Sequence, residues 1–411
     1  MKDNIENPLP VKPIELFRLP WSMTDNAMTW MEPTRFCNMT CEGCFQSRNV
    51  KTGKPLEQVE AELMGMLRLR KCDALLICGG EPLTHPHILE IISMVKAQKV
   101  KPVIFTNGMG LELSKLREFK KAGLFGITFH VDSYQSRPGW EGKTEDEINE
   151  LRQYFADMVH DAGGMCCAFN TTIYPETLGK IPAIVNWAAR NIDKVHVLTL
   201  IAIRTASSAD GYDYFAGGNK IDIGTTAYYT EKSYLKMSSL DLYGEVLKVL
   251  PWFRLCAYLG GTAIPDSLKW AIGSHIGTRE KNYGSMGAKT MEVLQNTNHL
   301  FKGSYLAYSK PLLNRMGKSL LLFSLFDKEI RKTMKRYLSG VLKNPSILFR
   351  NLCVQTISIV QPMDILANGE RNDCDGCPNK TIWNGQLVSA CRLEEYLEYS
   401  APISMVPQKV S

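Results

Sequence analysis

The residues of this chain best suited to chemistry are three cysteines that lie within eight residues of one another. Cys37, Cys41 and Cys44 have a C-x3-C-x2-C spacing and follow the extended run 28–33. Three thiolates can hold three irons of a cubane [4Fe–4S] cluster and leave the fourth iron without a protein ligand. Such an open iron can bind a substrate or a cofactor, whereas a closed cluster moves electrons. Zinc is the weaker interpretation, because structural zinc usually has four protein ligands.

A second group of cysteines lies near the carboxyl terminus. It consists of Cys353, then Cys374 and Cys377 in a C-x2-C spacing, and then Cys391. Four thiolates suit either zinc or a closed [4Fe–4S] cluster. Because the chain already has one candidate iron–sulfur site, the sequence favours an auxiliary cluster over zinc. The cysteines that lack metal spacing and are expected in the core are Cys72, Cys78, Cys166, Cys167 and Cys256.

The elements that must position these cysteines alternate between apolar strands and amphipathic helices. The predicted strands are 28–33, 73–78, 102–105, 126–131, 165–173 and 195–201. The predicted helices, with apolar residues at helical spacing, are 55–70, 85–98, 111–122, 144–160 and 177–190. Each repeat has the length of a βα unit, so we expect a parallel sheet with right-handed crossovers. Six strands fall short of a closed eight-stranded barrel and predict an α/β fold with an open, partial (β/α)6 barrel.

Glycines and polar residues follow the ends of the second, third and fourth predicted strands. In a parallel sheet, functional sites lie at the carboxyl ends of the strands. A Gly-Gly pair can instead make a tight turn, and an Asn-Gly pair can simply lead into a helix. His130 lies two residues before Asp132 and points to the same face, either as a proton relay or as a core histidine. The residues at these strand ends are Gly79, Gly80, Glu81 and Pro82, then Asn107, then Asp132 and Ser133.

The cysteine loop after the first strand and the Gly-Gly-Glu-Pro motif after the second resemble the radical S-adenosylmethionine (radical SAM) superfamily. The resemblance covers about the first half of the chain. It implies a [4Fe–4S] cluster on Cys37, Cys41 and Cys44, whose open iron binds S-adenosylmethionine. It also implies reductive cleavage to a 5′-deoxyadenosyl radical, with the electron coming from a protein such as flavodoxin or ferredoxin, and hydrogen abstraction from an unactivated carbon. The carboxyl-terminal cysteines resemble auxiliary-cluster extensions of other members, without the seven-cysteine signature of the peptide-maturing ones.

The same resemblance implies contacts with S-adenosylmethionine. The motif Gly79–Pro82 matches the one that meets the amino group of the methionine moiety, where absent side chains let a ligand approach. Asp132 and Ser133 match the position that contacts the ribose or the carboxylate. The family often has an aromatic residue just before the third cysteine; here Gly43 stands there, and Phe45 is the candidate for the adenine contact. The remaining candidates are Asn107, His130, Asn170 and the backbone of 198–200.

The composition favours a soluble globular protein with reduced thiols. The chain has 411 residues, of which 45% are apolar and 22% charged, and its length predicts two or three units. The start of the chain lacks the apolar run of a signal peptide, and apolar stretches such as 320–326 are too short to span a bilayer. Twelve cysteines without an export signal suggest metal binding rather than disulfides. We therefore expect the cytoplasm as the compartment.

The net charge of +6 is concentrated in one segment. Residues 301–350 contain eleven lysines and arginines but only two acids, Asp327 and Glu329, so this segment carries +9 and the rest of the chain carries −3. Leucines and aromatic residues lie among these cations. The segment is either a solvated helical face or an interfacial helix pair that meets anionic head groups at a membrane surface. No arginine-rich recognition motif is present, so nucleic acid is not expected.

Three functions remain open. The basic and apolar segment favours a radical SAM enzyme that acts on a lipid or other hydrophobic substrate, with C–C bond formation or adenosylation as candidate outcomes, similar in outline to members that build hopanoid or tetraether lipids. The first alternative is a radical SAM enzyme that modifies a peptide or protein side chain. The alternative of another class is a non-catalytic, zinc-binding interaction protein. The expected organisation is an arm at 1–27, the barrel at 28–203, a basic and apolar helical region at 204–350, and a cysteine-rich metal-binding region at 351–411.

Overall fold

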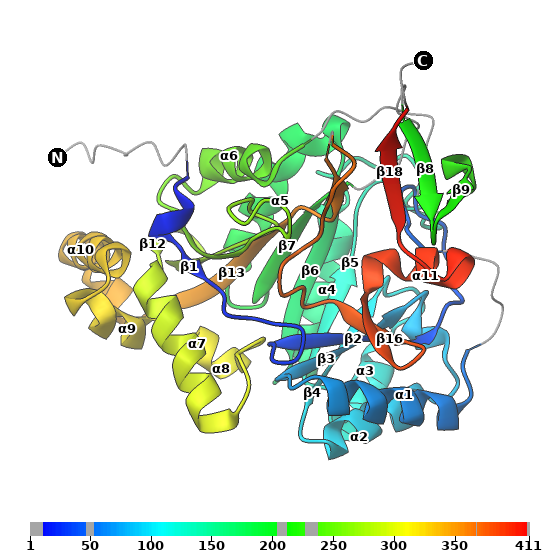
Figure 1. The fold of residues 1–411 in the computed structure, drawn as a ribbon. Helices are drawn as coiled ribbons and strands as arrows, with labels where there is room; N and C mark the ends of the chain where they lie inside the picture. The colour runs from blue at the N-terminus through cyan, green and yellow to red at the C-terminus, as the bar shows by residue number, and fades with distance from the viewer. Residues whose placement is uncertain (1–10, 47–52, 204–211, 227–236, 367, 409–411) are drawn as a thin grey trace.

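Six parallel strands alternate with helices in the first half of the chain, as the sequence predicts (Figure 1). The computed structural model describes residues 11–46, 53–203, 212–226, 237–366 and 368–408. The strands are β2 (Met28–Thr34), β3 (Ala74–Gly79), β4 (Lys101–Thr106), β5 (Gly126–His130), β6 (Cys166–Ile173) and β7 (Val197–Ala202). The helices between them are α1 (Leu56–Leu69), η2 (Pro82–Thr84), α2 (Ile88–Ala97), α3 (Leu113–Ala122), α4 (Asn149–Ala162), η3 (Pro175–Lys180) and α5 (Ile181–Arg190). The predicted partial barrel is confirmed.

The helices form where apolar residues recur at helical spacing. In α2, Ile88, Ile91, Ile92 and Val95 are buried, and their spacing of three and four residues puts them on one face. The strands between the helices are covered on both faces, which is why β3 is a continuous apolar run rather than an alternating one. Helix α3 ends at Gly123, whose left-handed backbone (φ 107°) turns the chain towards β5.

The main sheet is larger than the six predicted strands. Its order is β1-β10-β11-β13-β7-β6-β5-β4-β3-β2, and β12 (Asn282–Ser285) pairs with β11. The added strands on this path are β1 (Phe17–Arg18), β10 (Leu255–Leu259), β11 (Trp270–Gly277) and β13 (Cys353–Val360). β13 is parallel to β7, whereas β11 runs antiparallel to both β13 and β10. These strands cover the side of the partial barrel that the sequence leaves open.

This sheet corrects the expected division of the chain. The region 204–350 is not only helical, because it contains β10, β11 and β12. The region 351–411 contributes β13 to the centre of the sheet, and the expected arm contributes β1, which pairs with β10. Residues 1–10 of that arm lie outside the described residues. Pairing between strands so far apart in the sequence leaves no local pattern, which is why the periodicity did not show it.

A segment near the carboxyl terminus joins the two ends of the sheet; we call residues 372–380 the closing segment. On the β10 side, Cys374 forms a β-bridge with Gly261, and the amide of Asp375 donates to the carbonyl of Gly260 at 2.9 Å. On the β2 side, the Asn26 side chain donates to the carbonyl of Gly376 at 2.9 Å. The described strands therefore form a ring that is completed by irregular chain instead of by strand pairing.

The remaining strands form three small sheets. β14 (Asp364–Ile365) pairs with β15 (Arg371–Asn372), β16 (Lys380–Trp383) with β17 (Gln386–Ser389), and β8 (Tyr212–Ala216) lies between β9 (Asn219–Ile221) and β18 (Ile403–Pro407). Helix α11 (Leu393–Tyr399) follows η7 (Ala390–Arg392), and α6 (Ser239–Val249) packs against α5. The short helices η1 (Pro13–Glu15) and η4 (Ile223–Thr225) complete this set.

A group of helices covers the end of the barrel where the strands begin. They are α7 (Ala288–Lys302), α8 (Pro311–Asn314), α9 (Gly317–Leu320), η5 (Leu321–Leu325), α10 (Lys328–Lys343) and η6 (Pro345–Phe349). Lys101, the first residue of β4, donates to the carbonyl of Tyr308 at 2.6 Å, and Asp73, just before β3, accepts from the amide of Ala307 at 3.0 Å. In Figure 1 this group lies on the opposite side of the molecule from β8, β18 and α11.

Two large apolar clusters stabilise the molecule. The first lies between the main sheet and helices α1 to α6, and includes Val59, Ile92, Phe119 and Phe155. The second joins side chains of β2, β3 and β4 to those of β10 and to α7 and α10. In the described part of the chain, no helix is both long and apolar enough to cross a membrane.

Candidate active site

A cavity of about 230 Å³ lies where the parallel strands end. It is lined by Cys37, Cys41 and Cys44 from the loop after β2, and by Gly79 and Gly80 after β3. The lining residues at the ends of the other strands are Thr106, Asn107, His130, Asp132, Thr172, Ile201, Ala202 and Ile203. The fold thus brings residues as far apart in the sequence as Trp30 and Cys391 into one cavity.

The cysteine loop is held by the chain that follows β5. Cys41 forms an antiparallel β-bridge with Gln135, and the amide of Glu42 donates to the carbonyl of Tyr134 at 3.0 Å. The hydroxyl of Tyr174, just after β6, donates to the carbonyl of Glu42 at 2.6 Å. These contacts position the three thiols through the backbone, so the cysteine side chains need not anchor the loop.

The glycines after β3 are required by the close approach of that same loop. A Cβ on Gly79 would lie 2.1 Å from the carbonyl oxygen of Thr34, and one on Gly80 would lie 2.1 Å from that of Phe36. Gly79 also has φ of 106°, which side chains disfavour. The amide of Gly80 donates to Thr34 at 2.9 Å. The absent side chains therefore let β3 pack against the start of the cysteine loop.

Glu81 fixes the strand ends. Its carboxylate accepts hydrogen bonds from the amide of Leu83 at 3.0 Å, the hydroxyl of Thr106 at 2.7 Å and the amide of Asn107 at 2.7 Å. The side chain is buried, and this burial raises its pKa, while the hydrogen bonds act in the opposite direction. These three hydrogen bonds fix the loop that follows β3 to the end of β4. Pro82 begins the short helix η2 directly afterwards.

Asn107 connects this network to the first cysteine. Its side-chain amide donates to Asn38 at 2.8 Å and lies 3.9 Å from the sulfur of Cys37. The Asn107 side chain also accepts from the amide of Met109 at 2.8 Å, as in a turn. Asn107 therefore forms the turn that the sequence allows and also contacts the cysteine loop.

His130 and Asp132 form a pair at the end of β5. The Nε2 atom of His130 lies 2.9 Å from an oxygen of Asp132 and 3.1 Å from the hydroxyl of Thr172. The other oxygen of Asp132 accepts from the amide of Tyr134 at 3.0 Å. All three polar side chains line the cavity, so His130 is not a histidine of the closed core.

Four of the predicted contact residues do not line the cavity: Glu81, Pro82, Ser133 and Asn170. The amide of Ser133 donates to Glu145 at 2.5 Å, away from the lining residues. Asn170 pairs with His130 across β6 and β5, where its side chain is buried. Thr172, two residues further along the same face of β6, lines the cavity instead. The strand was correctly identified, but its end lies two residues beyond the predicted contact.

An apolar wall faces the polar strand ends. Phe45, the predicted adenine contact, lines the cavity together with Trp30 and Phe105, whose rings meet edge to face with centroids 5.5 Å apart. The further apolar lining residues are Met39, Ile201, Ile203 and Pro362. A wall of this kind favours apolar groups on whatever fills the cavity.

Two charged residues beside the cavity were missed in the sequence. The Arg137 guanidinium donates to Gln135 at 3.1 Å and is close enough to Cys41, Asp132 and Glu81 for them to raise its pKa against the lowering by burial. Glu32 is fully buried on β2 behind Trp30, and burial raises the pKa of its carboxyl group to about 7. A lone arginine after a strand and a lone glutamate within one give no spacing to recognise.

Three of the four carboxyl-terminal cysteines lie near one another. Cys374 is hydrogen-bonded to Cys377, and this bond, burial and the nearby Cys391 raise the pKa of Cys374. The same hydrogen bond lowers the pKa of Cys377 to about 6. Cys391 also lines the main cavity, so this group and the cysteine loop face a common region.

Cys353 lies apart from that group, in contrast to the expected four-cysteine site. Cys353 begins β13 and pairs with Gly277, whereas Val360 ends the strand and pairs with Trp270. Trp270 also pairs with Leu259, which lies two residues before the Gly261 that Cys374 contacts. Cys374 is therefore near the Val360 end of β13, and Cys353 is at the other end. Seven steps along β13 separate its ends by roughly 23 Å. Sequence spacing could not show this, because it does not give the direction in which β13 runs.

The donor set fits an iron–sulfur cluster on the loop. Cys37, Cys41 and Cys44 are each partly exposed and open into one cavity. In the residues that the structure describes, no three His, Cys, Asp or Glu side chains converge on a position for a single metal ion. A cubane cluster makes a different demand, because each thiolate binds its own iron.

Comparisons with known proteins find one family model and several solved structures. The family model described as the Radical SAM superfamily matches residues 31–188. No curated protein matches. The solved structures that the chain matches include Streptococcus suis SuiB bound to the precursor peptide SuiA, at 19% identity and TM-score 0.40, over 55% of this chain and 46% of that chain. Another is anSMEcpe with bound AdoMet, at 14% identity and TM-score 0.37, over 55% and 60% of the two chains. The chain thus spans less than two thirds of both structures.

Proposed function

Because residues 31–188 match the model of the Radical SAM superfamily, we propose that the chain is an enzyme of this superfamily, which cleaves S-adenosylmethionine reductively and directs the resulting radical at an unactivated carbon. The observation that carries the proposed reaction is the cavity in which three thiols, the chain after β3 and the polar ends of β4, β5 and β6 meet.

Cys37, Cys41 and Cys44 would hold the [4Fe–4S] cluster. When bound, the cluster and S-adenosylmethionine supply an electron transfer and a 5′-deoxyadenosyl radical, which ordinary side chains cannot provide. The electron would come from a protein reductant such as flavodoxin or ferredoxin. The Arg137 guanidinium lies near Cys41 and places a positive charge beside the cysteine loop.

The other side chains of the site would position the cysteine loop and surround S-adenosylmethionine. Glu81 fixes the ends of β3 and β4 through its three hydrogen bonds, and Asn107 holds the start of the cysteine loop. The pair of His130 and Asp132 presents both an acceptor and a titratable ring to the cavity, which suits polar groups such as ribose hydroxyls. Phe45 offers a face for adenine.

The substrate proposed for this cavity is hydrophobic. Its support is the wall of Trp30, Phe105, Ile201 and Ile203, which offers few polar partners. A lipid is the candidate favoured within this class, with hydrogen abstraction leading to C–C bond formation or adenosylation. The basic and apolar segment 301–350 no longer bears on the substrate, because it lies at the other end of the barrel. Modification of a peptide side chain is the alternative.

A second metal site is proposed at Cys374, Cys377 and Cys391. Its support is their proximity and the presence of Cys391 in the cavity lining. An iron–sulfur cluster is favoured over zinc, since thiolates suit both and the chain has one candidate cluster already. Cys353 takes no part in this proposal.

The experiment that tests the function is anaerobic reconstitution with iron and sulfide, followed by reduction in the presence of S-adenosylmethionine. The wild-type protein should bind iron and release 5′-deoxyadenosine, and the triple variant Cys37→Ala/Cys41→Ala/Cys44→Ala should release none. Cys72→Ala is the matched control, because Cys72 lies outside the cavity lining. A triple variant that still forms 5′-deoxyadenosine, or a wild-type protein that takes up only zinc, would contradict the proposal.

The substrate class can be tested with deuterated material. Perdeuterated lipid extract and deuterated cell peptides are supplied separately, and deuterium in 5′-deoxyadenosine is measured by mass spectrometry. Transfer from lipid alone supports the hydrophobic substrate. Transfer from peptide alone favours the alternative. Neither result bears on attachment to a membrane, because the segment 301–350 does not border the cavity.

A further inference from the structure

The end of the barrel opposite the cavity carries an unusual surface, which we call the basic–apolar surface. Its apolar side chains come from the end of α7, from α8, η5, α10 and η6, and they protrude into solvent. They are Leu300, Phe301, Leu312, Leu313, Met316, Leu322, Leu325, Phe326, Leu338, Leu342, Leu348 and Phe349. These are twelve of the 22 large exposed apolar residues in the described chain, gathered within 50 residues. A soluble face would not concentrate them in this way.

The most exposed of these side chains have almost no protein contact. Leu325 and Leu342 are each 85% exposed, and Phe349 is 86% exposed. Burying a leucine or phenylalanine side chain contributes about 1.5–3 kcal/mol, and folding gains little of this at these positions. The free energy is therefore available to whatever covers the surface.

Helix α10 shows how apolar and basic residues are combined. Its inner face is buried through Ile330, Thr333, Tyr337 and Gly340. Its outer face, at positions three and four residues apart, consists of Lys328, Arg331, Lys335, Leu338 and Leu342, all exposed. The cations occupy the first half of this stripe and the leucines the second.

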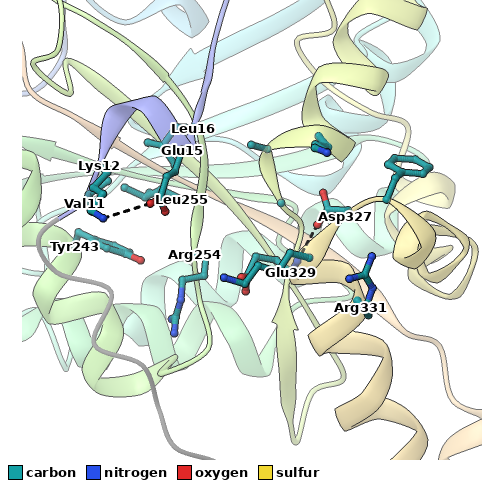
Figure 2. Close-up of a pocket in the computed structure, with 15 residues that line it drawn as sticks. Val11, Lys12, Glu15, Leu16, Tyr243, Arg254, Leu255, Asp327, Glu329 and Arg331 are labelled. Carbon is teal, nitrogen blue, oxygen red and sulfur yellow. Dashed lines mark hydrogen bonds and ion pairs between the residues drawn. The ribbon is translucent and has the colours of Figure 1, made fainter.

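The start of α10 is firmly held. Asp327 accepts from the amides of Glu329 and Ile330 at 3.0 Å each, and its other oxygen accepts from the amide of Thr290 in α7 at 2.9 Å. Figure 2 shows this residue at the edge of a cleft of about 800 Å³, across from Lys12 and Glu15. One carboxylate thus caps two helices, so the surface is formed before any partner arrives.

We propose that the basic–apolar surface docks on an anionic lipid bilayer. Each lysine or arginine near the acidic head groups contributes about 1 kcal/mol of binding free energy. The leucines and phenylalanines insert at the boundary between head groups and acyl chains. The segment 301–350 supplies eleven cations against two acids, which matches the charge of such a bilayer. A second copy of this chain would place these cations opposite each other, which repels. The phosphate backbone of nucleic acid would leave the leucines in water.

The position of the surface sets the orientation of the bound enzyme. Arg315 donates to the carbonyl of Asp193 before β7, and Met316 bridges to Leu352 before β13, so these helices lie against the amino ends of the strands. The cavity lies at the carboxyl ends. Docking would therefore leave the mouth of the cavity facing away from the bilayer. Because the two sites are at opposite ends of the barrel, membrane docking does not depend on the radical reaction.

The test is flotation of the full-length protein with vesicles of phosphatidylglycerol and phosphatidylcholine, compared with phosphatidylcholine alone. Binding is expected with the acidic vesicles and should weaken as salt is raised. Lys328→Glu/Lys335→Glu should weaken binding about tenfold or more, and the control Arg117→Glu/Lys121→Glu on α3, with the same change in charge, should not. Leu325→Glu/Leu342→Glu should also weaken binding to the acidic vesicles. Its control, Leu89→Glu/Leu397→Glu, changes two exposed leucines outside the basic–apolar surface and should bind like the wild type.

Three outcomes would overturn the proposal. These are no flotation with acidic vesicles at low salt, surface variants that float like the wild type, and a wild-type dimer that dissociates in Leu325→Glu/Leu342→Glu without binding vesicles. Circular dichroism of each variant verifies the fold. Release of 5′-deoxyadenosine should be unchanged in the surface variants, so a failure of docking and a failure of the proposed reaction are distinguishable.

Discussion

Among single residues, Glu81 connects the ends of two neighbouring strands of the site. Its two oxygens accept three hydrogen bonds, from residues that begin η2 and end β4. A buried carboxylate is costly unless its hydrogen bonds are satisfied, and here they are. Glu81 therefore acts as a positioning residue, because it touches the scaffold of the cavity and does not line it.

Replacing Glu81 with glutamine should loosen the site. The amide nitrogen of Gln would face a donor, so at least one of the three hydrogen bonds is lost at about 1–3 kcal/mol of unfolding free energy. Thermal unfolding and the spectral response of the reconstituted cluster to S-adenosylmethionine measure the two effects. Glu112→Gln, at an exposed position before α3, is the control. Equal stability of the two variants would show that the network is not needed.

Glu32 predicts a dependence of stability on pH. Burial raises its pKa from 4.5 to about 7, so the folded protein keeps this proton after the unfolded chain has lost it. The stability contributed by the protonated group is present below pH 4.5 and is lost as the pH rises to about 7, by roughly 3 kcal/mol, and it is constant above that. Stability measured by denaturant unfolding across this range should decline accordingly.

Glu32→Gln should remove that decline. An amide oxygen can still accept from Trp30 and Gln46, which donate to Glu32 at 2.8 and 3.0 Å, and it carries no charge to bury. At alkaline pH the variant should be more stable than the wild type by about 1–3 kcal/mol. Glu118→Gln, on the exposed face of α3, should follow the wild-type curve. Parallel curves for Glu32→Gln and wild type would refute the assignment.

At the scale of elements, the closing segment is the least regular part of the framework. Its residues 373–379 belong to no strand, and they are held by side chains and single bridges such as Arg70 to the carbonyl of Cys377 at 2.7 Å and Arg18 to Asp375. The buried Arg70 has its pKa lowered to about 10 by burial. Local opening of this segment is therefore expected to precede global unfolding.

Gly376→Ala should displace the closing segment. A Cβ there would lie 2.1 Å from the carbonyl oxygen of Trp21, with φ at 63°. Gly385→Ala is the matched control, since φ is 75° and no atom lies within 4 Å. Both variants carry about 1–2 kcal/mol of backbone strain, and the crowding at Gly376 adds about 1–3 kcal/mol more. Thermal unfolding and limited proteolysis near the carboxyl terminus report the difference, and equal sensitivity would contradict the close packing.

For the whole molecule, the direction of the strands decides which cysteines can cooperate. Cys353 and the other carboxyl-terminal cysteines lie at opposite ends of the barrel. In a background that lacks the three loop cysteines, Cys377→Ser should lose bound iron, while Cys353→Ser should keep it. Iron and zinc per chain, measured after anaerobic reconstitution, give the answer. Loss of metal in both variants would indicate that Cys353 is a ligand of the carboxyl-terminal metal site.

The sequence predicted the repeating half of this molecule well. β2 to β7 and α1 to α5 depend on local periodicity, and the observed bounds differ from the predicted ones by a few residues. The cysteine loop and the Gly79–Pro82 motif were found because their spacing is short and specific. The end of β6 at residue 173 was also predicted, but that Thr172 and not Asn170 lines the cavity was not, because the lining depends on how the ends of several strands meet.

What the sequence could not show depends on contacts between distant segments. β13 pairs with β7 although 150 residues separate the end of one from the start of the other, and no periodic pattern marks that choice. The roles of Glu32 and Arg137 likewise arise from burial beside a cavity that exists only in the folded chain. Single residues of this kind give no motif.

The insertion of β13 also matters while the protein is being made. Until residue 360 has left the ribosome, the hydrogen-bonding edge of β7 has no neighbour, and β11 cannot take its place because it pairs with β13 and β10. A nascent chain with such an uncovered edge can pair with other chains and aggregate. Chaperones that shield extended backbone during translation should therefore raise the yield of this protein more than those that act after its release.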